Sequence, residues 1–288
     1  MNRIVLALLL ATGLCPAQEL TRLDGCKRVP AAWADGDSFL VETPAGKQMT
    51  VRLYGADCIE WHVTDETDAR RLREQRRYFG ISGPAGKAAE SIALAKGFGK
   101  AAAEETARAL AQPFTVHTSF ADARGDGRHA RVYGFITTAA GEDLAVRLVG
   151  VGLARAFGVY RETPDKTRHD EYRERLRDLE FQAARLGKGV WAGTDWKALP
   201  FERRAQREEE AELAEATGRT GISEGEKLDP NTAARDELMR LPGVGEVTAN
   251  RIIEGRPFKK IEDLDRIEGI GKATLKRLLP FLEIKPPR

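Results

Sequence analysis

The sequence has few cysteines, little net charge and no long apolar run. Its 288 residues include three cysteines, and 46 basic residues nearly balance 44 acidic ones, which leaves a net charge of +2. A near-neutral chain does not announce a nucleic-acid-binding protein, so any basic surface has to come from local segregation of charge. Charged residues make up 31% and hydrophobic residues 42% of the chain, as in soluble globular proteins, and the length allows about two domains.

The marked apolar stretch, residues 4–14, is too short for a comfortable membrane span. A basic start precedes it and the small residue Ala17 follows it, a pattern typical of a secretory signal peptide cut after residue 17. We expect export to the periplasm or the extracellular space, with no stable membrane association after signal removal. Lipidation of Cys15 is an alternative, although Leu14 is larger than the residue that a lipobox favours, and a buried N-terminal helix is another.

Signal removal would leave two cysteines, Cys26 and Cys58. In an oxidising compartment, two remaining cysteines suggest one disulfide. Two unrelated buried thiols are the alternative.

The patterning predicts an α+β chain. Strands are expected at residues 38–41, 49–54 and 114–118, a hairpin over residues 131–148, and helices at residues 84–111, 144–153 and 172–186. Residues 200–217 are dense in Arg and Glu, which indicates a solvated helix or a linker, and a glycine-rich segment follows. We therefore expect domains at residues 18–197 and 226–288, joined by a charged linker at residues 198–225.

Two short acidic motifs carry the chemistry. The first is Asp35-Gly36-Asp37-Ser38, and the second runs from Arg52 through Asp57 to Glu60. Two carboxylates can hold a hard divalent cation, a third can act as a base, and the arginine can bind a phosphate. This set suits metal-assisted cleavage of a phosphodiester.

These motifs, in this order and flanking a hairpin, resemble those of the thermonuclease (staphylococcal-nuclease-like) family. Leu148-Val149, Gly152-Leu153-Ala154 and Gly189-Val190-Trp191 extend the resemblance over about residues 27–196. The resemblance implies an OB-type five-stranded β-barrel with helices. It also implies calcium-dependent hydrolysis of DNA and RNA without sequence specificity.

The resemblance assigns roles to individual residues. Asp37, Asp57 and the backbone carbonyl of Cys58 look like Ca²⁺ ligands, Glu60 looks like the general base, and Arg52 looks like a phosphate ligand that opposes growing charge. Asp35 looks like a supporting outer carboxylate.

A second phosphate-binding arginine is expected after the long helix. Arg131 matches the family's Arg-x-Leu-Ala-x-Val strand and has the better spacing to Leu148, whereas Arg128 matches a Gly-Arg step. We favour Arg131. Phe157 and Tyr160 are candidates for stacking on a base, with core packing as the alternative.

The chain departs from the family in two places. The usual Asp-x-Pro-Glu turn has Ile59 in place of proline, so proline does not set the backbone before Glu60. A long insert, residues 62–86, also separates this motif from the helix that follows. Both changes are expected to bear on the placement of Glu60 and on access of substrate.

The C-terminal segment contains an internal repeat. Residues 238–245 are echoed 26 residues later by residues 264–271, and each unit reads as helix, tight Gly-x-Gly turn, helix. Neither unit can bury its apolar face alone, so the two are expected to pack together.

This repeat resembles the tandem helix-hairpin-helix module of bacterial competence-type DNA receptors. The resemblance implies an all-α domain that binds DNA phosphates through backbone amides at helix N-termini, without sequence specificity. Lys276 and Arg251 are expected to add contacts. The residues expected at the hairpins themselves are Gly243, Gly245, Gly269, Gly271 and Lys272.

Three functions follow from these patterns. The leading one is an exported calcium-dependent nuclease whose C-terminal module tethers DNA. A non-catalytic periplasmic DNA-binding and capture protein is the alternative, and a nuclease whose tail docks a protein partner is the third.

Overall fold

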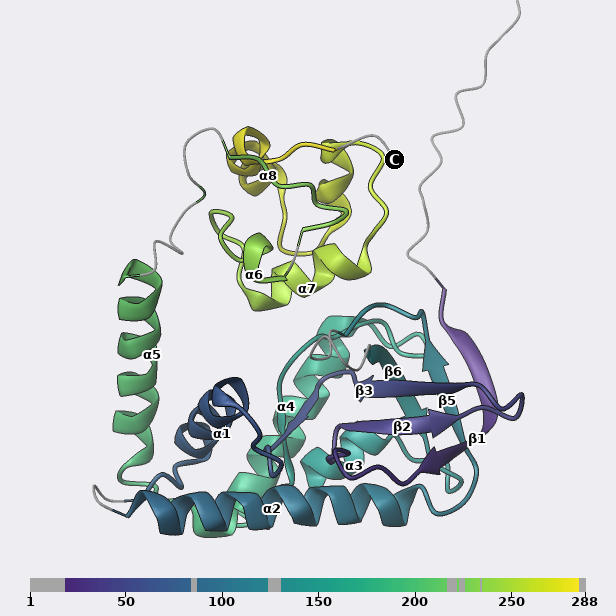
Figure 1. Ribbon diagram of the computed structural model, residues 1–288, viewed down its shortest axis with the longest axis vertical. Coiled ribbons are helices and arrows are strands. Elements are labelled where there is room, and N and C mark those ends of the chain that lie inside the picture. Colours follow the sequence, from purple (N-terminus) through teal and green to yellow (C-terminus); the bar gives the residue numbers. More distant parts are fainter. Residues whose placement is uncertain are drawn as a thin grey trace, which may run out of the picture.

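The computed structural model describes residues 19–83, 87–123, 131–216, 222, 226–233 and 235–284. A β-barrel with flanking helices is followed by a small helical module (Figure 1). The predicted signal segment and Arg128 lie outside the described residues. Within the described residues, no helix combines the length and apolar character needed to cross a membrane.

Five strands close into a barrel, which confirms the OB-type barrel predicted from the resemblance. They are β1 (Thr21–Val29), β2 (Ser38–Glu42), β3 (Gln48–Leu53), β5 (Phe114–Thr118) and β6 (Arg131–Thr137). Around the barrel the order is β1-β2-β3-β6-β5, and only the β3–β6 pair is parallel among these neighbours.

A separate two-stranded sheet joins β4 (Ala56–Cys58) to β7 (Ala154–Ala156). The two strands are antiparallel, and their register places Asp57 opposite Arg155. This pairing places Arg155 beside the second acidic motif, although the two are almost one hundred positions apart in the sequence.

Helices cover one side of the barrel. They are α1 (Glu66–Phe79), α2 (Ala88–Ala109), α3 (Leu144–Gly150), α4 (His169–Arg185), the 3-10 turn η1 (Gly189–Gly193) and α5 (Leu199–Ala216). The charged insert supplies α1, whose N-cap Asp65 accepts hydrogen bonds from two backbone N–H groups and whose C-cap Gly80 has φ of 65°.

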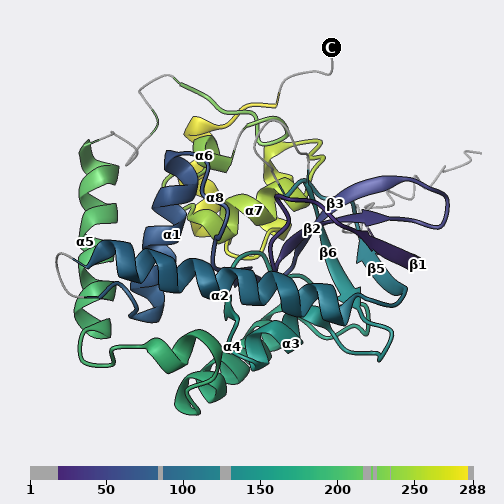
Figure 2. The ribbon, with the colours of Figure 1, turned by 60° about the horizontal axis from the view of Figure 1, so that its bottom comes forward.

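The charged segment after the barrel domain is the helix α5, and it packs against α1 (Figures 1 and 2). Arg77 and Arg73 of α1 form ion pairs with Glu209 of α5. Arg203 donates hydrogen bonds to the backbone carbonyl of Tyr78. The expected linker is therefore partly an extension of the barrel domain, because its charges pair with those of the insert.

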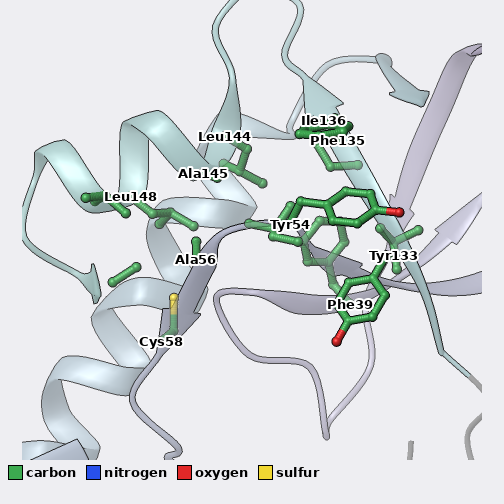
Figure 3. Close-up of a cluster of buried hydrophobic side chains, with 14 of the residues drawn as sticks. Phe39, Tyr54, Ala56, Cys58, Tyr133, Phe135, Ile136, Leu144, Ala145 and Leu148 are labelled. Carbon is green, nitrogen blue, oxygen red and sulfur yellow. The ribbon is translucent and has the colours of Figure 1, made fainter. Parts of the chain in front are cut away.

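The main hydrophobic core fills the barrel and extends into the space between the barrel and the helices α3 and α4 (Figure 3). Tyr54 is fully buried, and its ring stacks on Phe135 and Tyr133 at centroid distances of 4.6 Å and 5.1 Å. Leu144 and Leu148 of α3 are buried in the same cluster. Because Tyr54 directly follows β3, this packing fixes the chain inside the second acidic motif.

One expectation about local structure is wrong, and one open alternative is decided. Residues 131–148 do not form a two-stranded hairpin, because β6 is followed by a single bridge between Thr137 and Asp143 and then by α3, which Asp143 caps. Cys26 and Cys58 are free buried thiols and not a disulfide. They lie on β1 and β4, which belong to different sheets.

The C-terminal module is helical, apart from a single β-bridge between Leu228 and Leu282. It contains α6 (Arg235–Leu238), α7 (Glu246–Glu254), η2 (Ile261–Arg266), α8 (Lys272–Leu278) and η3 (Leu279–Phe281). Leu238 and Ile252 of the first unit are fully buried, and so are Leu264 and Leu278, their counterparts 26 residues later. The two units therefore pack on each other through equivalent positions, as the repeat predicts.

Candidate active site and nucleic-acid interface

The first acidic motif forms a side-chain-supported turn before β2. Asp35 Oδ1 accepts hydrogen bonds from the backbone N–H groups of Asp37 (3.1 Å) and Ser38 (2.6 Å). Burial, together with the carboxylates of Asp37 and Glu60, raises the pKa of Asp35 well above its ordinary value. Asp35 thus supports the turn that presents Asp37.

Asp37 ties this turn to the second motif. Its Oδ2 accepts a hydrogen bond from the backbone N–H of Cys58 at 3.0 Å. A Cβ at Gly36 would lie 2.6 Å from Cys58 Sγ and 2.8 Å from Ala102 Cβ. Glycine is required here because β4 and α2 approach the turn so closely.

Arg52 lies between the two predicted metal-binding aspartates. Its Nη2 is 2.8 Å from Asp57 Oδ1 and 3.6 Å from Asp37 Oδ2. Burial opposes the charge of Arg52, but Asp37 and Asp57 outweigh it and raise the pKa of the guanidinium above its ordinary value. The structure therefore brings together three of the residues that the motifs single out.

Glu60 joins the same cluster through a residue that sequence reasoning missed. Arg71 of α1 places Nη2 2.6 Å from Glu60 Oε1 and 3.5 Å from Asp57 Oδ1. Burial raises the pKa of Glu60, and Arg71 opposes this effect. The predicted general base is held by a cation from the insert.

A second missed residue is Arg155 on β7. Its Nε lies 2.8 Å from Asp57 Oδ2, and its guanidinium stands 4.0 Å from the centre of the Phe157 ring. Burial alone would raise the pKa of Asp57, but Arg155, Arg52 and Arg71 together lower it well below its ordinary range. No spacing in the sequence links Arg155 to Asp57, since the β4–β7 pairing alone makes them neighbours.

A third missed residue, Gln75, lies one helical turn after Arg71 on the same face of α1. Its Nε2 donates to Cys58 O at 2.7 Å and to Asp57 Oδ2 at 3.1 Å. Its Oε1 accepts from the backbone N–H of Glu60 at 2.8 Å. The insert thus contacts each end of the Asp57–Glu60 segment.

Arg131 lies near the cluster without joining it. It pairs with Thr50 at the start of the parallel β3–β6 register, two residues before the Arg52–Tyr133 pair, and so shares a sheet face with Arg52. Its Nε is buried without a hydrogen-bond partner among the described residues. The phosphate-binding role of Arg131 stays a prediction.

The aromatic candidates for base stacking are both engaged. Tyr160 is buried in the main core, and one face of Phe157 is covered by Arg155. For Tyr160 the core-packing alternative holds.

The oxygens at the site are of the type that Ca²⁺ prefers, but their arrangement does not fit the ion. Both oxygens of Asp57 face guanidinium or amide donors, and Cys58 O accepts from Gln75. Three arginines already compensate the carboxylates, whereas calcium needs roughly six to eight oxygen ligands. No cluster of three or more metal-binding side chains occurs among the described residues. Calcium would have to compete with Arg52, Arg71, Arg155 and Gln75 for these oxygens.

The C-terminal hairpins present their glycines to solvent. Gly243 and Gly269 have φ of +83° and +95°, which a glycine adopts without strain. Gly245 and Gly271 are the N-caps of α7 and α8, and no atom lies within 4 Å of the Cβ position at either residue. A phosphate can therefore approach these backbones closely.

Each hairpin is braced by the other unit. Arg251 of α7 donates a hydrogen bond to Glu268 O at 3.1 Å, beside Gly269, and Arg277 of α8 places Nη2 3.5 Å from the Cβ position of Gly243. Arg251 and Arg277 are equivalent in the repeat. Arg251 also forms an ion pair with the Glu268 carboxylate at 3.0 Å. Glu268 therefore competes with a DNA phosphate for this arginine.

The module contacts the barrel domain through acidic side chains. The Glu268 carboxylate lies against Nε2 of His169 of α4. Glu254 lies beside the Tyr54 hydroxyl and Arg161, and burial raises its pKa to about 7. A cavity of about 740 Å³ between the two parts is lined by arginines and glutamates in similar numbers, so its charge is mixed.

Known proteins share short stretches with this chain. "Endonuclease/exonuclease/phosphatase family domain-containing protein 1" is 46% identical over 57 residues in Xenopus laevis and 44% identical over 57 residues in Homo sapiens, covering 18% of this chain and 10% of each relative. A "Deoxyribonuclease" of Thioalkalivibrio sp. (strain K90mix) is 41% identical over 51 residues, covering 18% of this chain and 14% of the relative. The chain thus spans between a tenth and a seventh of the length of these curated relatives.

Two family descriptions match longer segments. A helix-hairpin-helix motif matches residues 223–283, where the paired hairpins lie. The staphylococcal nuclease homologue matches residues 50–193, half of the chain, and this span includes Arg52, Asp57, Glu60 and Arg131. The chain therefore belongs to the staphylococcal nuclease homologue family and carries a helix-hairpin-helix motif after the nuclease-like barrel.

Proposed function

We propose that this protein is a nuclease that hydrolyses phosphodiester bonds of DNA without sequence specificity, with RNA as a further substrate that the family implies. The observation that carries this proposal is the convergence of Glu60, Asp57, Asp37 and Arg52 in one buried cluster at the barrel rim. Carboxylates and guanidinium groups at one point provide a base for water and donors for a phosphate.

In this proposal Glu60 takes the proton from the attacking water, and Arg71 keeps its carboxylate oriented. Arg52 remains charged because Asp37 and Asp57 surround it, so it can oppose the negative charge that grows on the phosphate. Arg131 supplies the second guanidinium, with its unpartnered Nε on the same sheet face.

Calcium dependence enters the proposal from the family alone. Asp37, Asp57 and the Cys58 carbonyl remain the predicted Ca²⁺ ligands, but Arg71 and Gln75 compete for the same oxygens. Digestion with calcium and with a chelator tests the requirement directly.

The helix-hairpin-helix module is proposed to hold DNA near the barrel. The open backbones at Gly245 and Gly271 support phosphate contact, and tethering raises the local concentration of substrate. Deletion of residues 226–288 should weaken duplex binding and reduce its salt dependence. Unchanged affinity and salt dependence would assign the tail to a protein partner instead.

We also propose export, on the basis of the N-terminal pattern described above. N-terminal sequencing of protein from the extracytoplasmic fraction should begin at Gln18. An intact Met1 in that fraction, or retention of the protein in the cytoplasm, would refute the proposal.

The decisive experiment is Glu60→Gln. Loss of the base should abolish DNA digestion, whereas Glu104→Gln, which removes an exposed partner of Lys100 on α2, should leave digestion unchanged. Full activity of Glu60→Gln would show that Glu60 is not the general base.

A non-catalytic DNA-capture protein is the second candidate. It is favoured by one observation, which is that both oxygens of Asp57 are already engaged by protein donors. Duplex binding without strand cleavage, under conditions with and without calcium, would establish this function.

A further inference from the structure

The segment between Asp57 and Glu60 has little backbone support of its own. The strand β4 ends at Cys58, and residues 59–64 form no regular secondary structure. No proline restricts the segment, since Ile59 stands before Glu60. The direction of the Glu60 side chain therefore has to be set by contacts from elsewhere in the fold.

Two helices supply these contacts. Gly99 of α2 lies so close that a Cβ there would be 2.3 Å from the Ile59 carbonyl oxygen. Gln75 of α1 approaches from another element and hydrogen-bonds Asp57, Cys58 and the backbone N–H of Glu60. The Gln75 amide thus spans the segment from end to end.

The placement of Gln75 is unusual for a residue that only anchors a helix. It is 1% exposed, and burial of an amide is costly unless its hydrogen-bonding groups are satisfied. Leu72 and Phe79 already anchor α1 in an apolar cluster with Ile59. Arg76 also connects α1 to α2, because it donates a hydrogen bond to Ser91 Oγ. An apolar residue at position 75 would serve this anchoring as well.

We propose that Gln75 is a positioning residue for the hydrolytic site, which fixes the Asp57–Glu60 backbone so that the Glu60 carboxylate faces the phosphate. The proposal rests on the nuclease function proposed above. It makes the insert helix α1 a necessary part of the catalytic centre, with Gln75 acting through Glu60 and not on the substrate.

The test compares two substitutions on the same helix attachment. Gln75→Met keeps the side-chain length but removes all three hydrogen bonds to the segment. Ser91→Ala removes the buried hydroxyl that accepts from Arg76 and donates to the Ile81 carbonyl, without contact with the motif. Steady-state digestion of duplex DNA and the urea midpoint of unfolding are measured for both variants.

We expect Gln75→Met to lower kcat by about ten- to one-hundredfold with KM changed less than twofold, because displacement of a catalytic group by about 1 Å costs this much. Ser91→Ala should keep kcat within twofold at a comparable loss of stability. Equal losses of kcat in the two variants, or an unchanged kcat in Gln75→Met, would overturn the proposal.

Hydrogen exchange provides a readout that is independent of activity. The Glu60 amide should be protected in the wild-type protein and lose at least tenfold protection in Gln75→Met, while amides in the barrel strands keep theirs. Gln75→Glu serves if the methionine variant does not fold, since it keeps the acceptor for Glu60 N–H but loses both donors. It should retain amide protection and still lose kcat, and full kcat in this variant would contradict the proposal.

Different results would refute the nuclease activity and the positioning role of Gln75. An inactive wild-type protein, or an active Glu60→Gln variant, refutes the nuclease assignment. A wild-type enzyme that requires Glu60 but is indifferent to Gln75 refutes only the positioning role.

Discussion

Arg71 Nη2 lies 2.6 Å from Oε1 of Glu60, so the proposed general base is held by a cation from the inserted helix α1. The same Nη2 is 3.5 Å from Asp57 Oδ1. Arg71 thus occupies the position from which a bound cation would contact both carboxylates, and it lies on a helix that the second acidic motif does not include.

The first prediction concerns calcium. Arg71→Gln removes the competing charge, so calcium should stabilise this variant more than the wild-type protein. At saturating calcium we expect an additional gain of about 1 to 2 kcal/mol, or roughly 2–8 °C in Tm. Thermal melts with and without calcium measure it. Arg70→Gln, which alters an exposed neighbour paired with Glu66, is the control and should respond like the wild type.

The second prediction concerns Arg155, which is buried against Asp57. Arg155→Met leaves a buried carboxylate short of one partner, so the free energy of unfolding should fall by about 3 kcal/mol. Urea titration measures the loss. Arg204→Met breaks the exposed pair with Glu208 and should cost less than about 1 kcal/mol. Similar costs for the two variants would show that Arg155 contributes no more than a surface charge.

The third prediction is a pH dependence at the contact between the two parts of the chain. Burial raises the pKa of Glu254 to about 7 from an ordinary value of 4.5, although the Tyr54 hydroxyl and Arg161 oppose this effect. The folded protein therefore favours the protonated acid. The stability contributed by this group is complete below pH 4.5 and is lost as the pH rises through 7.

Glu254→Gln imitates the protonated acid and should be more stable than the wild type at pH 8. The difference in Tm should shrink toward pH 4, where the wild-type carboxyl is protonated in both states. Glu262→Gln, at an exposed position of the same module, is the control. A Tm difference that does not vary between pH 4 and pH 8 would contradict the burial of Glu254.

The fourth prediction concerns the DNA-binding hairpins. Lys272 is exposed at the first position of α8, directly after the open Gly271. Lys272→Ala should weaken duplex binding equally for all sequences and reduce the slope of log K against log salt by about 0.9. Lys259→Ala, at an exposed position outside the hairpins, is the control. An unaltered slope in Lys272→Ala would remove this residue from the interface.

Much of the architecture is predictable from local patterns. Alternating apolar residues and the turn around Pro44 and Gly46 indicate β2 and β3, and the 26-residue repeat indicates two packed helical units. The convergence of Arg52, Asp57 and Glu60 also follows, since they lie within nine residues, on β3, on β4 and directly after β4.

The residues that complete the cluster are not predictable in this way. Gln75 and Arg71 stand in a strongly charged insert. Leu72 and Phe79 mark the buried face of its helix, but nothing local shows which polar residues beside them meet Asp57 and Glu60. Arg155 faces Asp57 because of strand pairing across almost one hundred residues. The choice between a disulfide and two free thiols at Cys26 and Cys58 could not be made from the sequence for the same reason, since their separation depends on how two sheets are placed.

The sequence by itself determined the two modules, their order, and the residue types available for phosphodiester chemistry, because these follow from periodicity and from motifs within short stretches. Only the tertiary structure decided which donors meet Asp57 and Glu60. The physical reason is that a buried charge takes its partners from whatever elements pack around it, and here those elements are α1 and β7, which come from distant parts of the chain.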